Sequence, residues 1–528
     1  MASRDPAYSS LLTIVALLCP LSYFDRQFHP YCTQLRRANA MDRPNIVFIM
    51  PDQLRHDFLS CYGADFIETP NIDALGQQGI CYNQAYSEHP VCVPARASLL
   101  TGMNAIKNGV LSNGQYLRDD YQNCGLQTWP ELLGEQGYYT VGTGKMHFFP
   151  WEKRFGFDHR IIAEDKLWGF IEDDYYHYLN AAGYSKTAFA DLPEYHQNHM
   201  ACISPLPWEY TCDHFVGRES TRWIEEYEGE APFAMMIGFP GPHSPYDPAP
   251  EYAQFNLQDM PEPIGAEPDD TKLMRTAGRT RSTPSRKAWY AVQNDEPPTR
   301  ETYLLQRAYY AGLIAQIDLE VGRIVEALAK KGVLDNTVII FSSDHGDYLG
   351  DHGLSGKGSY YESACHVPML VRHPALSSAS ISEDLVTLTD ITATIVGLSG
   401  RPIPSYMDAR PLPGLGLDEE KREYIFGALQ KGWMLYDGEW KLCKYPSGAH
   451  LFNLHEDPCE SHNRARDASC ADIFHRLDAQ LTHEVMRSTN EASFAGCISP
   501  TSNSSSRTFG RPGHGRTYPT PWNETYSD

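Results

Sequence analysis

The sequence lacks the excess of basic residues that a general nucleic-acid-binding protein carries. Its 44 Lys and Arg are outnumbered by 67 Asp and Glu, which gives a formal net charge of −23. A surface of this sign repels phosphate backbones and anionic lipid headgroups, so we expect neither a nucleic acid nor an anionic membrane surface as a general partner. An anionic small substrate stays open, because a metal ion and a few local cations can reverse the field inside a cleft.

Long apolar runs are also missing. Residues 11–18 form a short apolar run after Arg4, and neither this run nor any other stretch is long enough for a membrane span. The run resembles a signal-peptide core, but acidic and basic residues separate it from the Ala-Asn-Ala at 38–40, which has the composition of a cleavage site. Residues 1–40 are therefore equally compatible with a signal segment and with a misplaced start before Met41. Export, whether periplasmic or secreted, and a cytoplasmic location are equally compatible with the sequence.

Regularly spaced cysteines and internal repeats are absent too. The 13 Cys include no Cys-x-x-Cys pair. Cys202 could bridge to Cys212, and Cys459 to Cys470, or all the cysteines could be reduced thiols of a large chain. Both alternatives stay open at the level of the sequence.

What the chain does contain is an alternation of β-branched apolar runs with amphipathic stretches, which is typical of an α/β fold. Four apolar runs predict strands that each lead into polar or ionisable residues: 45–50, 138–142, 232–239 and 337–342. A further strand is predicted at 80–85, and helices are predicted at 71–79, 128–136, 215–227 and 300–331. We therefore predict a large, mostly parallel, doubly wound sheet flanked by helices.

The remaining segments divide the chain into parts. Residues 150–215 are aromatic and acidic with weak periodicity and predict an irregular insertion over the site, while 248–300 predict a long loop. After residue 400, short strands at hairpin spacing and a closing helix at 471–487 predict a small α+β domain. The predicted parts are an N-terminal segment (1–40), a catalytic domain (41–400), a small C-terminal domain (401–497) and a disordered tail (498–528).

Metal-ligating side chains follow two of the predicted strands. Asp52 and Gln53 come after the first strand, and Asp344 and His345 come after the fourth. In open α/β sheets ligands bind at the carboxyl ends of the strands, so these side chains are expected to meet. The oxygen-rich set suits one divalent cation, Ca²⁺ first, with Mg²⁺ or Mn²⁺ as alternatives. A single Asp-His pair is more often a surface turn, but an Asp at the end of a buried strand, repeated on a second strand, favours a metal site.

The stretch 90–102 predicts a helix with Cys92 at its N-terminus. Pro94 suits the first turn, and Gly102 can end the helix in the left-handed region. The helix dipole and Arg96 favour negative charge near Cys92, as an anionic nucleophile or an anionic substrate would require. A buried structural cysteine is the alternative interpretation.

The residues Cys-Val-Pro-Ala-Arg-Ala-Ser-Leu-Leu-Thr-Gly of this stretch resemble the signature of the type I sulfatase family, Cys-x-Pro-x-Arg followed by an apolar pair and Thr-Gly. In that family the cysteine is oxidised to formylglycine (3-oxoalanine), whose hydrate is the nucleophile. The resemblance implies an alkaline-phosphatase-like fold and a sulfuric ester hydrolase that releases inorganic sulfate. It also implies a maturation partner, either a formylglycine-generating enzyme or an anaerobic sulfatase-maturing enzyme.

Further residues match the family pattern in the same order. Lys145 and His147 match its Gly-Lys-x-His segment, His243 its later active-site histidine, and Lys357 its second substrate-binding lysine. The resemblance implies that the two lysines neutralise the sulfate oxygens, His243 protonates the leaving oxygen and His147 acts as a base. It implies that Arg96 orients the nucleophile.

The metal set implied by the resemblance is Asp52, Gln53, Asp344 and His345 together with position 92. Gln53 departs from the commoner pattern of two aspartates and resembles the choline sulfatase and phosphonate monoester hydrolase branch. A phosphonate monoester hydrolase or phosphodiesterase acting at the same site is therefore an alternative, and a non-catalytic binding homologue is another.

The nature of the ester is left open by the sequence. Trp168 and the tyrosines at 175, 176 and 178 could stack on a sugar or an aryl group, or they could pack as a lid. Carbohydrate, choline and aryl sulfates all remain candidates.

Overall fold

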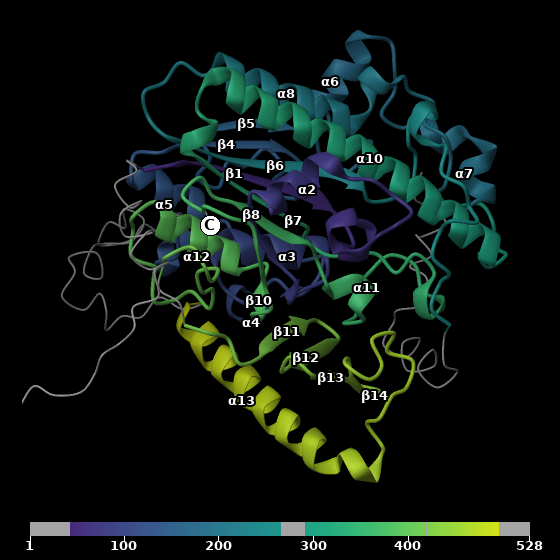
Figure 1. The fold of residues 1–528 in the computed structure, drawn as a ribbon, viewed down its shortest axis with the longest axis vertical. Helices are drawn as coiled ribbons and strands as arrows, with labels where there is room; N and C mark the ends of the chain where they lie inside the picture. The colour runs from purple at the N-terminus through teal and green to yellow at the C-terminus, as the bar shows by residue number, and fades with distance from the viewer. Residues whose placement is uncertain (1–42, 266–290, 418–419, 496–528) are drawn as a thin grey trace, which may run out of the picture. The chain divides into compact units, whose positions relative to one another are not determined.

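The computed structural model describes residues 43–265, 291–417 and 420–495 (Figure 1), all within one compact unit. The predictions for residues 1–40 and 498–528 lie outside the described residues. Among the described residues, none of the helices combines the length and the apolar character that a membrane span requires.

An eight-stranded sheet forms the centre of the fold, in the order β5-β4-β6-β1-β7-β8-β2-β9. Its strands are β1 (Asn45–Asp52), β2 (Gly79–Tyr82), β4 (Tyr139–Gly144), β5 (His159–Ile162), β6 (Phe233–Pro242), β7 (Thr337–Ser342), β8 (Met369–Arg372) and β9 (Ser380–Ser382). The four central neighbours β4, β6, β1 and β7 are parallel, whereas β8 runs antiparallel to both β7 and β2. The predicted α/β class with a mostly parallel sheet is confirmed.

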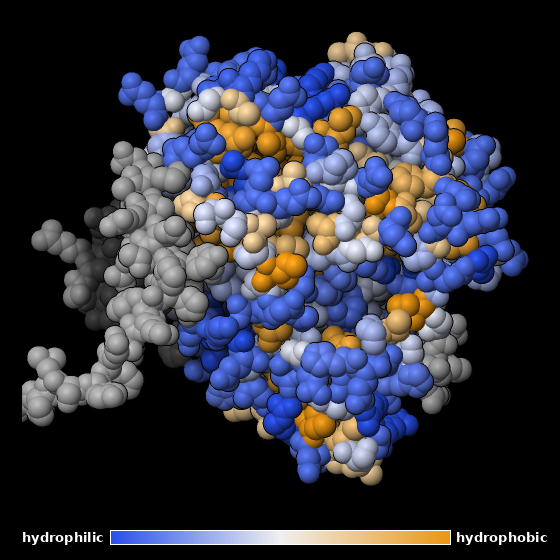
Figure 2. Space-filling model, in the orientation of Figure 1, coloured by the Kyte–Doolittle hydropathy of each residue, from blue (hydrophilic) through white to orange (hydrophobic). Residues whose placement is uncertain are grey.

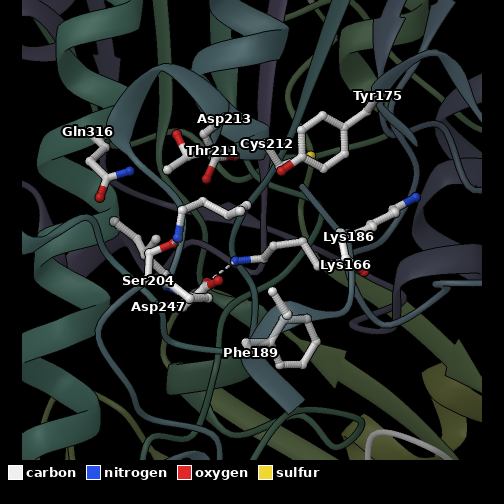
Figure 3. Close-up of a pocket in the computed structure, with 15 residues that line it drawn as sticks. Lys166, Tyr175, Lys186, Phe189, Ser204, Thr211, Cys212, Asp213, Asp247 and Gln316 are labelled. Carbon is white, nitrogen blue, oxygen red and sulfur yellow. Dashed lines mark hydrogen bonds and ion pairs between the residues drawn. The ribbon is translucent and has the colours of Figure 1, made fainter. Parts of the chain in front are cut away.

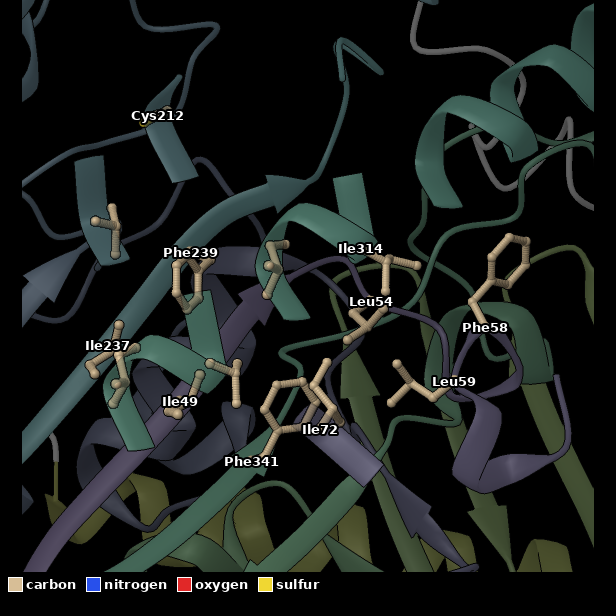
Figure 4. Packing of buried hydrophobic residues seen from close by; sticks show 14 of the residues in the cluster. Ile49, Leu54, Phe58, Leu59, Ile72, Cys212, Ile237, Phe239, Ile314 and Phe341 are labelled. Carbon is tan, nitrogen blue, oxygen red and sulfur yellow. The ribbon is translucent and has the colours of Figure 1, made fainter. Parts of the chain in front are cut away.

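Both faces of the sheet are buried, which explains the unbroken apolar runs. Along β1, Val47 and Ile49 belong to one hydrophobic cluster, while Phe48 and Met50 belong to another. Because successive side chains of a strand point to opposite faces, the two clusters lie on the two sides of the sheet. Figure 4 shows the first cluster, where Ile49 and its neighbours on β6 and β7 pack together with Ile314 of a covering helix.

Helices cover each face. The first cluster includes side chains of α2 (Pro70–Gln77), α8 (Cys212–Glu226) and α10 (Arg300–Lys331). The second includes side chains of α3 (Cys92–Thr101), α5 (Trp129–Glu135) and α12 (Asp390–Leu398). Figure 1 shows the two groups of helices on opposite sides of the sheet. Shorter helices are α4 (Ala105–Asn108), α6 (Asp174–Ala181), α7 (Pro193–Gln197) and α11 (Glu362–Cys365).

Two expectations about the connections were wrong. Residues 150–215 are not an irregular insertion, because β5 joins the edge of the main sheet in parallel with β4 and is followed by α6 and α7. The strand predicted at 80–85 is two strands, β2 and β3 (Ala85–Tyr86), and β3 pairs with β10 (Val386–Thr387) in a separate small sheet. The described parts of 248–300 form a loop with one short 3₁₀ turn, as predicted.

A four-stranded antiparallel sheet follows near the C-terminus, in the order β11-β12-β13-β14. Its strands are β11 (Ile425–Leu429), β12 (Gly432–Tyr436), β13 (Trp440–Tyr445) and β14 (Gly448–Asn453), and α13 (Ala471–Ala495) closes the chain. Leu477 and Leu481 of α13 cluster with Leu442 and Leu451 of the sheet. The predicted α+β character is confirmed, and the boundaries at 400 and 497 stay predictions. Figure 2 shows that the visible face of the molecule is largely hydrophilic, with apolar groups scattered over it.

Candidate active site

The polar residues that follow the four predicted strands meet at one edge of the sheet. β4, β6, β1 and β7 are neighbours and run parallel, so their carboxyl ends lie together. The structure brings all ten predicted site residues to this edge, nine of them buried and Lys357 half-buried: Asp52, Gln53, Cys92, Arg96, Lys145, His147, His243, Asp344, His345 and Lys357.

Cys92 begins α3, as predicted, and Gly102 ends this helix with a φ of 70°. The Cys92 Sγ lies 3.2 Å from His345 Nε2 and 3.9 Å from Asp52 Oδ1. Burial would raise the pKa of the Cys92 thiol, but the nearby charges of Lys357, His345 and Lys145 lower it well below its usual range. The site therefore stabilises an anion at position 92.

Arg96 binds both acidic residues of the predicted metal site, Asp52 and Asp344. Its Nη2 donates to Asp52 Oδ2 at 2.8 Å and its Nε donates to Asp344 Oδ2 at 2.9 Å. A third bond, from Nη1 to the Lys145 carbonyl oxygen at 2.5 Å, ties the guanidinium to the end of β4. Because all three nitrogens are engaged, Arg96 holds one oxygen of each carboxylate and leaves the other to face the interior of the site.

The remaining acidic oxygens fit a cation. Asp52, Cys92, Asp344 and His345 each offer a ligand atom within 4.8 Å of the others, and all four residues are buried. Burial and the neighbouring Asp52 raise the pKa of Asp344, which is the expected effect of two carboxylates that share one site. A divalent cation among these atoms would relieve that repulsion, so the residues fit a metal ion.

Gln53 lies beside this cluster with a backbone φ of 71°. Its backbone N–H donates to Asp344 Oδ1 at 2.9 Å, its Nε2 donates to Asp347, and its Oε1 accepts from Lys357 Nζ at 2.5 Å. A non-glycine residue in the left-handed region is strained, and such positions cluster at functional sites. Gln53 as a metal ligand stays a prediction. Its contacts show that it links Asp344 to Lys357.

Lys145 is completely buried between two carboxylates. Its Nζ lies 2.9 Å from Asp52 Oδ2 and 2.7 Å from Asp165 Oδ2. Asp165 also lies 4.0 Å from His243 Nε2, so one carboxylate faces both Lys145 and His243. Sequence reasoning missed Asp165, although it follows β5 just as the other site residues follow their strands. The signal was weak because β5 reads His-Arg-Ile-Ile, and its apolar run is only two residues long.

His243 and Lys357 contact each other directly. Lys357 Nζ lies 2.8 Å from His243 Nε2, and the other ring nitrogen, Nδ1, donates to the Ser244 carbonyl oxygen at 2.6 Å. These two contacts assign the neutral tautomer with its proton on Nδ1, since Nε2 faces an ammonium donor. The imidazole is thereby held with Nε2 toward the site.

His147 also adopts a positive φ, of 60°. Its backbone N–H donates to Glu164 Oε2 at 3.0 Å, and its ring contacts Trp168 edge to face with centroids 4.4 Å apart. The Nδ1 of His147 is buried and has no hydrogen-bond partner within the described ranges. Glu164 was missed for the same reason as its neighbour Asp165, and it acts by holding the strained turn.

Residues 44–401 match the family model described as Sulfatase. The chain belongs to the sulfatase family. It is accordingly an enzyme of the sulfuric ester hydrolase class. Residues 350–487 also match a model described as N-sulphoglucosamine sulphohydrolase, C-terminal.

Individual relatives support the family assignment. An arylsulfatase of Clostridium perfringens is 30% identical over 414 residues, which cover 73% of this chain and 81% of that protein. A choline-sulfatase of Rhizobium meliloti is 26% identical over 451 residues, covering 80% and 83% of the two chains. The crystal structure of a phosphonate monoester hydrolase of Agrobacterium radiobacter shares the fold, with a TM-score of 0.71, 24% identity and coverage of 84% and 96%.

Beside Asp247, in the segment of this sulfatase that follows His243, lies a small cavity of about 20 Å³, shown in Figure 3. Lys166 lines it, pairs with Asp247 and donates to the Pro245 carbonyl oxygen at 3.0 Å. Asp213 accepts the Gly241 N–H at 2.8 Å, and burial raises the pKa of its carboxyl to about 6. A volume of this size holds about one water molecule. The cavity therefore supports the segment that carries His243 and does not admit a substrate.

The described cysteines of the sulfatase are all free thiols. Cys202, Cys212 and Cys470 are buried and Cys459 is exposed, and none of the four is in a disulfide. Of the two alternatives that the sequence left open, the structure has the reduced thiols.

Proposed function

We propose that this sulfatase hydrolyses a sulfate monoester and releases inorganic sulfate through a nucleophile at position 92. The observation that carries the proposal is the set of cations around Cys92, in which Lys357, His345 and Lys145 together lower the thiol pKa despite complete burial. A site that stabilises an anion this strongly is suited to a charged nucleophile and to the oxygens of a sulfate group.

Cys92 is proposed to be the precursor of formylglycine, formed by a formylglycine-generating enzyme or an anaerobic sulfatase-maturing enzyme. The hydrated aldehyde supplies an oxygen nucleophile and a second hydroxyl, which an unmodified thiol lacks. The surrounding residues suit this group, because His345 Nε2 and Asp52 Oδ1 already lie within 4 Å of the side chain at position 92.

A divalent cation is proposed as the cofactor, Ca²⁺ first, with Mg²⁺ or Mn²⁺ as alternatives. Asp52, Gln53, Asp344 and His345 would hold it together with residue 92, where it would lower the pKa of a hydroxyl group and offset negative charge. Hard oxygen ligands from two carboxylates and an amide are the reason for placing Ca²⁺ first.

The two lysines are proposed to bind the non-bridging sulfate oxygens. Lys145 is fixed by Asp52 and Asp165, so its charge is already in place before the substrate arrives. Lys357 contacts only neutral acceptors, Gln53 Oε1 and His243 Nε2, among its described hydrogen bonds. A sulfate oxygen is a stronger acceptor than either and would compete for this ammonium.

His243 is proposed to donate a proton to the leaving oxygen. When a sulfate oxygen takes over Lys357 Nζ, the His243 Nε2 is released and can carry the proton that the leaving group needs. A histidine titrates near neutral pH and suits such a role. His147 is proposed as the base, because its buried Nδ1 has no partner in the described part of the chain and its ring is adjacent to position 92.

A phosphonate monoester or phosphodiester is the second candidate substrate. Gln53 favours it, because a neutral amide in place of a second aspartate makes the site less negative toward a phosphorus centre. Rates on an aryl sulfate and the matching aryl phosphonate, measured side by side with the same enzyme, separate the two. A larger kcat/KM on the phosphonate would overturn the assignment to sulfate esters.

The test of the function is sulfate release. Protein produced together with a maturation enzyme is expected to release sulfate from at least one of aryl sulfates, choline sulfate and carbohydrate sulfates, as measured by ion chromatography. Cys92→Ala should abolish release, whereas Cys124→Ala, a half-buried cysteine outside the site, should retain it. No release by protein with confirmed formylglycine would support a binding-only homologue instead.

A further inference from the structure

Two exposed aromatic rings lie close to His147, one two residues after it in the chain and one stacked on its neighbour Trp168. Phe149 is 61% exposed and Phe170 is 75% exposed, whereas most large apolar side chains of the described chain are buried. Tyr116 and Trp168 are half-buried beside them. We call these four residues, Tyr116, Phe149, Trp168 and Phe170, the aromatic rim. Apolar rings left in water next to a buried reactive centre indicate a binding surface.

One half of the aromatic rim extends outward from His147. The Trp168 ring lies edge to face on His147 with centroids 4.4 Å apart, and Phe170 stacks beyond it with centroids 6.3 Å apart. His147 belongs to the same strand-end site as Cys92 and is among the groups that lower the pKa of the Cys92 thiol. A continuous series of rings therefore leads from the nucleophile position to an exposed phenyl group.

The other half of the rim starts two residues after His147. Phe149 packs against Tyr116 with ring centroids 5.2 Å apart. Tyr116 in turn packs against the cluster of Val93, Ala97 and Val110, and Val93 directly follows Cys92. Both halves of the rim are thus anchored beside the reacting centre.

The tyrosines that the sequence grouped with Trp168 have a different role. Tyr175 is buried and donates to the Tyr210 carbonyl oxygen at 2.8 Å, and Tyr178 stacks on Tyr210 with centroids 5.4 Å apart. Both rings also contact Phe215, so they belong to the packing of α6 against α8. Trp168, by contrast, contacts the site residue His147.

The polar groups nearest the rim are already engaged. Glu164 binds the backbone N–H groups of Met146 and His147, and Asp165 is paired with Lys145. A phenyl ring offers an apolar face with no hydrogen-bond donor or acceptor. A sugar could lay its C–H face on these rings, but its hydroxyl groups would gain no new partner from the engaged carboxylates, whereas a flat apolar group would gain contact area over its whole face.

We propose that the aromatic rim binds the alcohol part of the ester by stacking, and that the substrates of this enzyme are aryl sulfates with a flat, apolar ring system. This inference rests on the proposed function, since it assumes that the sulfate group lies at Cys92. The lysines bind the anionic end of the substrate and the aromatic rim binds the other end.

Sulfonates test the inference without turnover, because their sulfur is bonded to carbon and is not released. Calorimetry on the matured enzyme would compare methanesulfonate, 2-naphthalenesulfonate, a methyl glucoside 6-sulfonate and trimethyltaurine, the sulfonate analogue of choline sulfate. We expect 2-naphthalenesulfonate to bind at least about tenfold more tightly than methanesulfonate, as stacking of one ring system predicts. Tightest binding of the sugar sulfonate or of trimethyltaurine would overturn the aryl assignment.

Variants of the exposed rings locate the effect. Phe149→Ala and Phe170→Ala should each weaken the binding of 2-naphthalenesulfonate about three- to tenfold and leave the affinity for methanesulfonate unchanged. Trp433→Ala, which removes a 42% exposed ring on β12, is the control and should change the affinity for neither sulfonate. Unchanged naphthalenesulfonate affinity in both rim variants, with methanesulfonate still bound, would overturn the role of the rim alone. Failure of every sulfonate to bind would contradict the sulfate site itself and the inference with it.

Discussion

Lys357 shows how single residues of this site are prepared for a substrate. Its Nζ contacts Gln53 Oε1 at 2.5 Å and His243 Nε2 at 2.8 Å, so two neutral groups hold a charge that a sulfate oxygen would hold more strongly. Lys145 differs, because carboxylates on both sides fix it permanently. One lysine is preorganised, and the other couples substrate binding to the release of His243.

The role of His243 predicts a dependence on the leaving group. His243→Ala should keep the fold and lose about 10²–10⁴-fold in kcat on a phenyl sulfate, whose leaving oxygen needs a proton. The loss should be smaller on 4-nitrophenyl sulfate, whose leaving group departs as a stable anion. Steady-state rates on the two esters measure the difference. Equal losses on both would exclude His243 as the proton donor.

Glu88 predicts a dependence of stability on pH. It is buried, and burial raises the pKa of its carboxyl from 4.5 to about 7. A raised folded-state pKa gives stability that is complete below the unfolded pKa and is lost as the pH rises through the folded pKa. Glu88→Gln does not titrate, so between pH 5 and pH 8 the variant should gain up to about 3 kcal/mol relative to wild type.

Thermal or denaturant unfolding of both proteins at the two pH values checks this prediction for Glu88. All other titrating groups are common to the two proteins and cancel in the difference. A wild-type-to-variant difference in unfolding free energy that is the same at pH 5 and pH 8 would contradict the burial of an ionisable carboxyl at this position.

Site residues that belong to a sequence motif could be predicted. Residues that hold those site residues in place, and belong to no motif, could not. Cys92, Arg96 and Lys145 stand in recognisable local patterns, and the structure brings them together as expected. Asp165 and Glu164 stand in no pattern, because their effect depends on the placement of β5 beside β4. Side chains that act through another residue leave little trace in a single sequence.

At the scale of elements, the sequence predicted four strands that lead into polar residues, and it left their order open. The order β4-β6-β1-β7 places the latest of these strands beside the earliest. Crossover helices such as α10 set that order, since parallel neighbours need a long connection. The meeting of Asp52 with Asp344 follows from this topology and could only be expected from the general behaviour of parallel sheets.

The end of α3 predicts a cost for a side chain at Gly102. Its φ of 70° disfavours other residues, and a Cβ there would lie 2.6 Å from Met407 Sδ. Gly102→Ala should therefore cost about 2–4 kcal/mol, from the left-handed conformation together with overpacking. Gly332→Ala is the matched control, because this residue ends α10 at a φ of 78° with open space around it. It should cost about 1 kcal/mol.

Denaturant unfolding of the two glycine variants measures both costs. The prediction requires Gly102→Ala to be clearly the more destabilised of the two. Equal destabilisation would mean that the Met407 side chain moves aside at no cost in stability and that only the backbone conformation matters.

At the scale of the whole molecule, one buried lysine connects the C-terminal sheet to the catalytic part. Lys441 on β13 is fully buried, and its Nζ lies 2.6 Å from Glu362 Oε1 and 2.7 Å from Glu460 Oε1. Glu362 belongs to α11, shortly after the Lys357 loop. These ion pairs thus hold the C-terminal sheet against the segment that carries Lys357.

Removal of this cation should be costly. Lys441→Met leaves the buried carboxylate of Glu460 and the half-buried carboxylate of Glu362 without this cation and should lower the unfolding free energy by about 3–5 kcal/mol. Lys444→Met on the same strand removes the partner of Asp478 at a half-exposed position and should cost about 0–1 kcal/mol. Calorimetric unfolding of both variants distinguishes them, and a small effect for Lys441→Met would show that the sheet is held by apolar packing alone.

Mass spectrometry of the peptide around Cys92, taken from enzyme with measured sulfate release, tests the proposed nucleophile directly. We expect a mass about 18 Da below that of the unmodified cysteine peptide, because an aldehyde replaces the thiol, and labelling by a hydroxylamine reagent that thiols do not react with. Fully active enzyme whose residue 92 is found only as a free thiol would contradict formylglycine as the source of the nucleophile.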